Sequence, residues 1–329
     1  HNINASQRDG EGLAYNDDNK AANGKDKIEG KTNGFLYKEW NNDIKDYLYD
    51  WCSLHEVNSF FYMGNSLSLK GVLDQSQVKD VKQVFENLKP DLMKNRRGLP
   101  IGDEIELNTL VNYFVERRAK LCPEEKIYCK NFKDERDIAA ALVIDVSGST
   151  SADIDGKGVL EIEKSAAFLL AEGLKELGDK FGIFGFSSLG RERCFYYIFK
   201  EFEEDWGDEQ KQRLLGFYPN GTTRIGAAIR HTTEKLKKID SQRKLMILIT
   251  DGKPQDNDGY TTEGFYAQYD VRMACIEAKR NNIAVFCLST RDNSLNELEL
   301  MFPVKRYVIM RDITELPQLL AKSYIKLTI

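Results

Sequence analysis

The sequence has no apolar run approaching the roughly 18 residues of a membrane-spanning helix, so no membrane span is predicted. It has no excess of basic residues either. Its 47 lysines and arginines are intermixed with 52 aspartates and glutamates, which argues against a dedicated nucleic-acid-binding protein. Six cysteines lie far apart and form no CxxC pair. We therefore expect reduced thiols in a cytoplasmic protein and no structural zinc site. Cys275 and Cys287 lie in apolar segments, so their thiols are expected to be buried.

What remains is a chain of 329 residues with an ordinary globular composition, 41% hydrophobic and 30% charged. Changes in composition divide it into three segments. Residues 1–34 have almost no aromatic residues and are interpreted as a flexible linker or tag. Residues 35–136 are predicted to form a small, mostly helical extension that packs on a domain spanning residues 137–329. Aromatic anchors between residues 37 and 51 occur partly at helical spacing, and apolar residues over 78–88 and 107–115 predict two helices. The chain does not begin with Met and has no signal-peptide pattern, so we expect part of a longer protein.

From residue 137 onward, predicted strands and helices alternate. Segments 138–146, 180–186, 244–249, 283–288 and 304–310 are predicted strands, and the first is one continuous apolar run. Segments 160–177, 225–239, 266–281 and 316–327 are predicted helices. This alternation is typical of an α/β fold with a doubly wound, mainly parallel sheet and helices on both faces. Such folds bind ligands beyond the carboxyl ends of their strands.

Oxygen-bearing side chains follow these predicted strands. Asp145 ends the first strand, with Ser147 and Ser149 just after it; the pair Thr222-Thr223 precedes a helix, and Asp251 ends another strand. Three loops at one edge of a parallel sheet would bring these groups together. Carboxylates and hydroxyls without Cys or His suit Mg²⁺, and an open position would accept a carboxylate from a partner. The simpler alternative is that they only form turns and helix caps.

The same residues resemble the metal-ion-dependent adhesion site of the von Willebrand factor A domain. That site has the pattern Asp-x-Ser-x-Ser, then a Thr before a helix, then an Asp after a strand. Thr223 fits better than Thr222, because its distances to Ala228 and Ile229 match the family's spacing. The resemblance implies a Rossmann-like sheet over residues 137–329. It also implies a Mg²⁺ or Mn²⁺ site formed by Asp145, Ser147, Ser149, Thr223 and Asp251.

A narrower resemblance lies in the surrounding segments. Residues 102–105, 170–174, 184–188, 221–231 and 243–252 look like the C-terminal part of the NorD/CbbO family. Proteins of that family work with a MoxR-class AAA+ ATPase to activate or remodel a client metalloenzyme, either nitric oxide reductase or Rubisco. The resemblance implies a non-catalytic adaptor whose metal ion is completed by an acidic side chain of the partner.

Two other classes of protein are weighed against the adaptor. A metal-dependent phosphohydrolase would need a general base or a second acid near the metal, and the position two residues after Asp145 is occupied by Ser147. There is also no GxxxxGK[ST] phosphate-binding loop. An extracellular adhesion domain is disfavoured by the absence of a signal peptide and by the scattered cysteines.

Three expectations concern charged residues near these motifs. Arg224 and Lys253 are expected at the exposed rim of the site, where charges tune the rate of encounter with a partner. Asp256 and Asp258 are expected in a solvated loop. The acidic run 201–205, with Trp206 after it, is expected at an exposed sheet edge.

Overall fold

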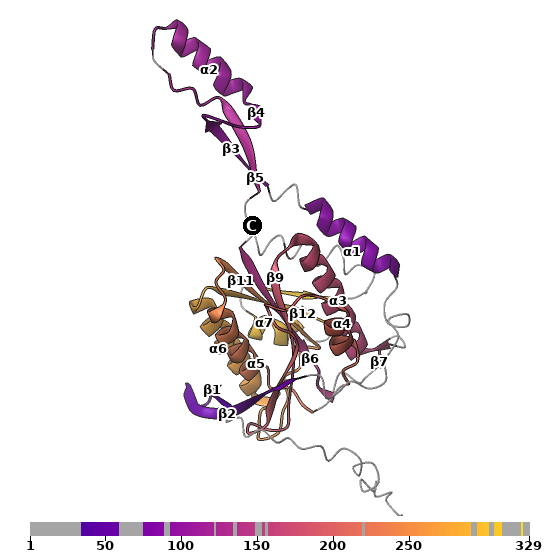
Figure 1. The fold of residues 1–329 in the computed structure, drawn as a ribbon. Coiled ribbons are helices and arrows are strands. Elements are labelled where there is room, and N and C mark those ends of the chain that lie inside the picture. The colour runs from indigo at the N-terminus through magenta and orange to yellow at the C-terminus, as the bar shows by residue number, and fades with distance from the viewer. Residues whose placement is uncertain are drawn as a thin grey trace, which may run out of the picture. The chain divides into compact units, whose positions relative to one another are not determined.

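The computed structural model describes residues 34–58, 75–88, 93–121, 123–133, 137–148, 153–154, 157–218, 221–290, 295–302, 306–310 and 324. Their main feature is an eight-stranded sheet in the order β1-β2-β10-β9-β6-β11-β12-β13 (Figure 1). The strands are β1 (Phe35–Asn41), β2 (Asp46–Asn58), β6 (Ile138–Asp145), β9 (Lys180–Ser188), β10 (Cys194–Lys200), β11 (Arg243–Thr250), β12 (Ile283–Ser289) and β13 (Tyr307–Ile309).

The sheet is mainly parallel, as predicted. Strands β9, β6, β11, β12 and β13 run in the same direction, and antiparallel pairing is confined to β10 with β9 and β1 with β2. The register pairs Asp145 with Phe186, and Ile144 with Ile249. The carboxyl ends of β6, β9 and β11 therefore lie at one edge of the sheet.

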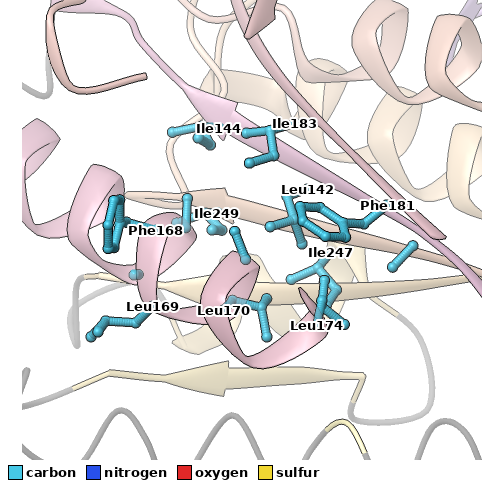
Figure 2. Packing of buried hydrophobic residues seen from close by; sticks show 14 of the residues in the cluster. Leu142, Ile144, Phe168, Leu169, Leu170, Leu174, Phe181, Ile183, Ile247 and Ile249 are labelled. Carbon is cyan, nitrogen blue, oxygen red and sulfur yellow. The ribbon is translucent and has the colours of Figure 1, made fainter. Parts of the chain in front are cut away.

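Helices cover both faces of this sheet (Figure 1). They are α3 (Val159–Leu177), α4 (Asp208–Leu215), α5 (Ile225–Lys238), α6 (Tyr266–Arg280) and α7 (Leu295–Met301). All eight residues of β6 are buried, because a central parallel strand is covered on both faces. Its alternate residues enter two cores, with Leu142 and Ile144 on the α3 side and Val143 on the other. Figure 2 shows the first core, where Ile247 and Ile249 of β11 pack with side chains of α3.

The segment before residue 137 differs in part from the prediction. Two predicted helices are present, α1 (Gln75–Leu88) and α2 (Leu107–Arg118), but residues 35–41 and 46–58 are strands that extend the main sheet. The expectation of a mostly helical segment is therefore wrong for these strands. The aromatic anchors occur partly at helical spacing, but Cys52 and Leu54 are buried at the period of two that a strand requires. The domain boundaries themselves stay predictions.

Further short strands complete the described chain. Strands β3 (Met93–Leu99), β5 (Tyr128–Lys133) and β4 (Glu104–Ile105) form a small sheet, and β7 (Asp153–Ile154) pairs with β8 (Lys157–Gly158). The predicted strand 304–310 corresponds to β13. Residues 1–33 of the predicted linker 1–34, and most of the predicted last helix 316–327, lie outside the described residues. Within the described chain, no helix has the length and apolarity to cross a bilayer.

The expectation that Trp206 lies at an exposed edge is wrong. Its indole is buried against Phe168 and Phe181, and Nε1 donates a hydrogen bond to Glu172 Oε1 at 2.9 Å. Because the residues before Trp206 in the sequence are acidic, the local pattern predicted an exposed position for a residue of the core. Cys275 and Cys287 are both buried, as their apolar surroundings predicted.

Helix α1 approaches α3 closely enough to require a glycine. A Cβ atom on Gly173 would lie 2.9 Å from ring atoms of Phe85, which is fully buried. Beside this contact, Lys82 Nζ lies 2.9 Å from Glu172 Oε2. The absence of a side chain at position 173 thus allows α1 to pack on the domain.

Gly173→Val should lower stability by about 1–3 kcal/mol, because the new methyl groups overlap the Phe85 ring in a packed interface. Thermal unfolding measures this effect. Glu161→Ala, at an exposed position of the same helix, is the control and should change stability by no more than about 0.5 kcal/mol. Equal melting temperatures for the wild type and Gly173→Val would contradict the packing described.

Candidate metal-binding site

Three loops are tied together beyond the carboxyl ends of β6, β9 and β11. The Gly148 amide donates to the Gly221 carbonyl at 2.7 Å, and the Thr223 amide donates to the Gln255 carbonyl at 2.7 Å. Gly221 has a φ of 76°, and a Cβ atom there would lie 2.5 Å from the Ser188 carbonyl oxygen. Only glycine fits this turn, which brings the loop before α5 against the loop after β6.

Asp145 is the centre of the cluster and is fully buried. Its Oδ1 accepts a hydrogen bond from the Ser147 amide at 3.0 Å and lies 3.4 Å from the Thr223 hydroxyl, which donates to it. Its Oδ2 accepts from the Thr250 hydroxyl at 2.9 Å. These donors are all neutral, so they orient the carboxylate without balancing its charge.

A second carboxylate, Asp251, acts on Asp145 from the end of β11. Asp251 is also fully buried, and its Oδ1 accepts a hydrogen bond from the Lys253 amide at 3.1 Å. Burial, followed by the negative charge of Asp251, raises the pKa of Asp145 from 3.8 to about 7. A cation between these groups would offset both the burial cost and the repulsion.

The chemistry of this donor set fits a hard divalent cation. Two carboxylates and several hydroxyls are oxygen ligands of the kind that Mg²⁺ and Mn²⁺ prefer. In the described part of the chain, no group of three or more His, Cys, Asp and Glu side chains is arranged to hold a metal ion by itself. A site here would therefore depend on its hydroxyls as well as on its two carboxylates.

The five predicted ligands stand as follows. The structure brings Asp145, Ser147 and Thr223 together, and it places Asp251 where its charge acts on Asp145. Ser149 lies outside the described residues. Metal ligation by these residues stays a prediction.

The neighbouring threonines of the loop before α5 point to different partners. The Thr222 hydroxyl donates to the Ser188 carbonyl at 2.8 Å and contacts Asp256, while the Thr223 hydroxyl lies toward Asp145. This geometry agrees with the choice of Thr223 as the candidate ligand. It leaves Thr222 a role in holding the loop.

Two expectations about charged neighbours are wrong. Arg224 is buried rather than exposed at a rim, and it forms ion pairs with Glu39 at 2.5 Å and Asp256 at 2.9 Å. Asp256 is buried rather than solvated. Although burial opposes its ionisation, hydrogen bonds from Thr222, the Gly190 amide and Arg224 hold its pKa below the ordinary value.

Sequence reasoning could not have found Glu39, which lies 185 residues from Arg224 in the chain. It belongs to a strand that was predicted to be helical. Lys253, in contrast, is exposed as expected.

Residues 140–322 match the model of the von Willebrand factor type A domain family. This match covers more than half of the 329 residues, and the mainly parallel sheet with helices on both faces agrees with it. The chain therefore belongs to the von Willebrand factor type A family.

Curated relatives place it among the NorD-type members of that family. Protein NorD from Stutzerimonas stutzeri is 34% identical over 233 residues, which cover 70% of this chain and 38% of that protein. Protein NorD from Brucella suis is 32% identical over 288 residues, which cover 88% of this chain and 45% of that protein. The chain thus spans less than half the length of these relatives.

Among solved structures, the pilus adhesin SpaC from Lactobacillus rhamnosus GG aligns with a TM-score of 0.47 and 16% identity. The alignment covers 59% of this chain and 31% of that one.

Asp145→Asn should stabilise the chain in EDTA at pH 8, because it removes one of two buried carboxylates that repel each other. The pKa of Asp145 is near 7 in the folded state and 3.8 ordinarily, so this residue is ionised in both the folded and the unfolded chain at pH 8. At that pH, folding carries the full free-energy cost of burying an ionised carboxylate beside Asp251. As the pH falls below 7, the folded chain takes up a proton while the unfolded chain stays ionised, so this cost decreases steadily and disappears only near the ordinary pKa of 3.8.

The gain from Asp145→Asn should therefore be largest at pH 8, at most roughly 4 kcal/mol, and should shrink by pH 5.5. Thermal unfolding in EDTA at the two pH values measures the difference. A variant that is less stable than the wild type at pH 8, or a gain independent of pH, would show that the carboxylates do not repel.

Proposed function

We propose that this chain is a non-catalytic, metal-dependent protein-binding module. The observation that carries the proposal is the convergence of Asp145, Ser147 and Thr223, with the charge of Asp251 beside them, at the carboxyl edge of the sheet. Asp145, Ser147, Ser149 and Thr223 would hold Mg²⁺ or Mn²⁺, with Asp251 binding directly or through water. When bound, the ion would offer a coordination position to a carboxylate of another protein.

The same cluster gives little support to a metal-dependent phosphohydrolase, which would need a general base near the metal. The two described histidines are engaged elsewhere. His231 contacts Tyr37 and Glu56, and His55 contacts Ser53 and the carbonyl of Glu192. A phosphatase assay with Mg²⁺ tests this alternative directly.

The proposed partner is a MoxR-class AAA+ ATPase, which would present an acidic side chain to the metal. The proposed outcome is activation or remodelling of a client metalloenzyme of the nitric oxide reductase or Rubisco type, in the cytoplasm. The support comes from the sequence motifs that resemble the NorD/CbbO family and from relatives named NorD at 34% and 32% identity. Because the matched part of this chain covers only 38% and 45% of those relatives, their full activity is proposed for this chain only as part of a larger assembly.

The two neighbouring threonines provide a matched pair of variants for the metal site. Thr223→Ala should weaken Mn²⁺ binding by about tenfold or more, because it removes a ligand hydroxyl. Thr222→Ala should largely retain the affinity, because its hydroxyl faces Ser188 and Asp256. Isothermal titration calorimetry measures both. The reverse order of affinities would reassign the ligand.

The contact with the ATPase should depend on the metal. Pull-down of the cognate MoxR-class ATPase should succeed with Mg²⁺ and fail with EDTA, since chelation removes the ion that joins the two proteins. Asp145→Ala should abolish recovery in both conditions, while Glu161→Ala, exposed on α3, should behave like the wild type. Equal recovery with and without EDTA would exclude a metal-bridged contact and leave the fold assignment intact.

A further inference from the structure

We infer that the β1–β2 hairpin positions the candidate metal site, with Glu39 and Arg224 as its positioning residues. The inference rests on the proposed metal site, and it adds a region that no motif of the site includes. The hairpin consists of residues 35–58 and extends the main sheet beyond β10.

Arg224 is the residue through which the hairpin would act. It follows Thr223 directly, at the N-terminus of α5, and only 2% of it is exposed. Its guanidinium lies against the ring of Tyr260, with 4.4 Å between Cζ and the ring centroid. It also donates to the carbonyl of Asn257 at 3.1 Å. The arginine is thus fixed among the loops that surround the site.

Glu39 holds this arginine from the hairpin. Its Oε2 accepts from Arg224 at 2.5 Å and from the Cys52 thiol at 3.0 Å, while its Oε1 accepts from the Tyr266 hydroxyl at 2.8 Å. Only 1% of Glu39 is exposed. A charged pair this deeply buried has little freedom, because separating its members leaves an uncompensated charge in the interior.

Asp256 extends the connection to the other side of Arg224. Its Oδ2 accepts from Arg224 Nε at 2.9 Å, and its Oδ1 accepts from the Gly190 amide at 2.9 Å and from the Thr222 hydroxyl. One arginine therefore links β1 to the loops that follow β9 and β11 and to the loop that carries Thr223. A shift of Glu39 would therefore displace Arg224 and, with it, the hydroxyl of the adjacent Thr223.

A second set of contacts keeps the hairpin seated on α5 and α6. Buried Asp270 accepts from the Trp40 amide at 2.8 Å, from Arg230 at 2.7 Å and from the Tyr260 hydroxyl at 3.0 Å. Gly226 permits this arrangement, because a Cβ atom there would collide with Asp270 Oδ2. Since Tyr260 also contacts Arg224, the two sets of contacts meet beside the site.

The coupling between hairpin and metal is reciprocal by thermodynamic linkage. If a seated hairpin keeps Thr223 in place for the metal, then the bound metal must in turn stabilise the seated hairpin. A protein that binds the hairpin would therefore have different affinities for the metal-bound and the metal-free chain.

The test compares Mn²⁺ affinities of the full chain by calorimetry. Glu39→Ala should weaken binding by about tenfold or more, the range found when residues that orient metal ligands are removed. Glu39→Gln, whose amide oxygen still accepts from Arg224, should lose less. Lys38→Ala is the matched control: it removes the hairpin's contact with Glu277, at 3.4 Å, and Lys38 has no described contact with Arg224, Asp256 or Asp270. It should bind Mn²⁺ like the wild type.

A second measurement needs no variant and so remains decisive if Glu39→Ala fails to fold. Adding Mn²⁺ to the wild type should slow hydrogen exchange of the β1 amides, including that of Trp40. Unchanged exchange on metal binding, equal affinity in Glu39→Ala, or an equal loss in Lys38→Ala would overturn the inference. Absence of any Mn²⁺ binding by the wild type would instead overturn the proposed function.

Discussion

The constraint on which the site depends is a carboxylate buried at the end of an apolar strand. All eight residues of β6 are buried, including Asp145, which is the last residue of the strand. A buried charge requires a partner, because the interior solvates it poorly. The donors described for Asp145 are neutral, and the adjacent arginine is engaged by Glu39 and Asp256. The two clusters therefore differ in charge: beside the site an arginine pairs with two acids, and at the centre of the site lie two carboxylates.

This difference gives the two clusters different roles. The cluster around Arg224 combines one cation with two acids and neutral donors, so it can stay fixed without a ligand. The cluster around Asp145 has two carboxylates close enough for one to raise the pKa of the other. A fixed frame around two neighbouring carboxylates suits cation binding, since the frame sets the geometry and the carboxylates supply the attraction.

Much of the fold could be predicted because local patterns and tertiary structure agree. The apolar run of β6 and the helical periods of α3, α5 and α6 each predict the element observed. The site motifs could be placed because parallel strands present their carboxyl ends at one edge. The hairpin could not, because its aromatic residues also fit a helical spacing, and the pairing of β2 with β10 joins residues far apart in sequence.

The buried charges were missed for a related reason. Nothing near Arg224 in the sequence indicates a partner in β1, and an arginine or aspartate in a loop is most often solvated. The burial of Trp206 was also missed, because its acidic neighbours in the sequence indicate an exposed position although its ring lies in the core. Residues whose partners are distant in the chain are those for which local pattern carries the least information.

The central claim is that Asp145 is a metal ligand. It is tested most directly by calorimetric titration of the purified chain and of Asp145→Ala with Mg²⁺ and Mn²⁺. The account predicts a single saturable site in the wild type and no measurable binding in a variant that remains folded. Unchanged metal affinity in Asp145→Ala would contradict the assignment of the site.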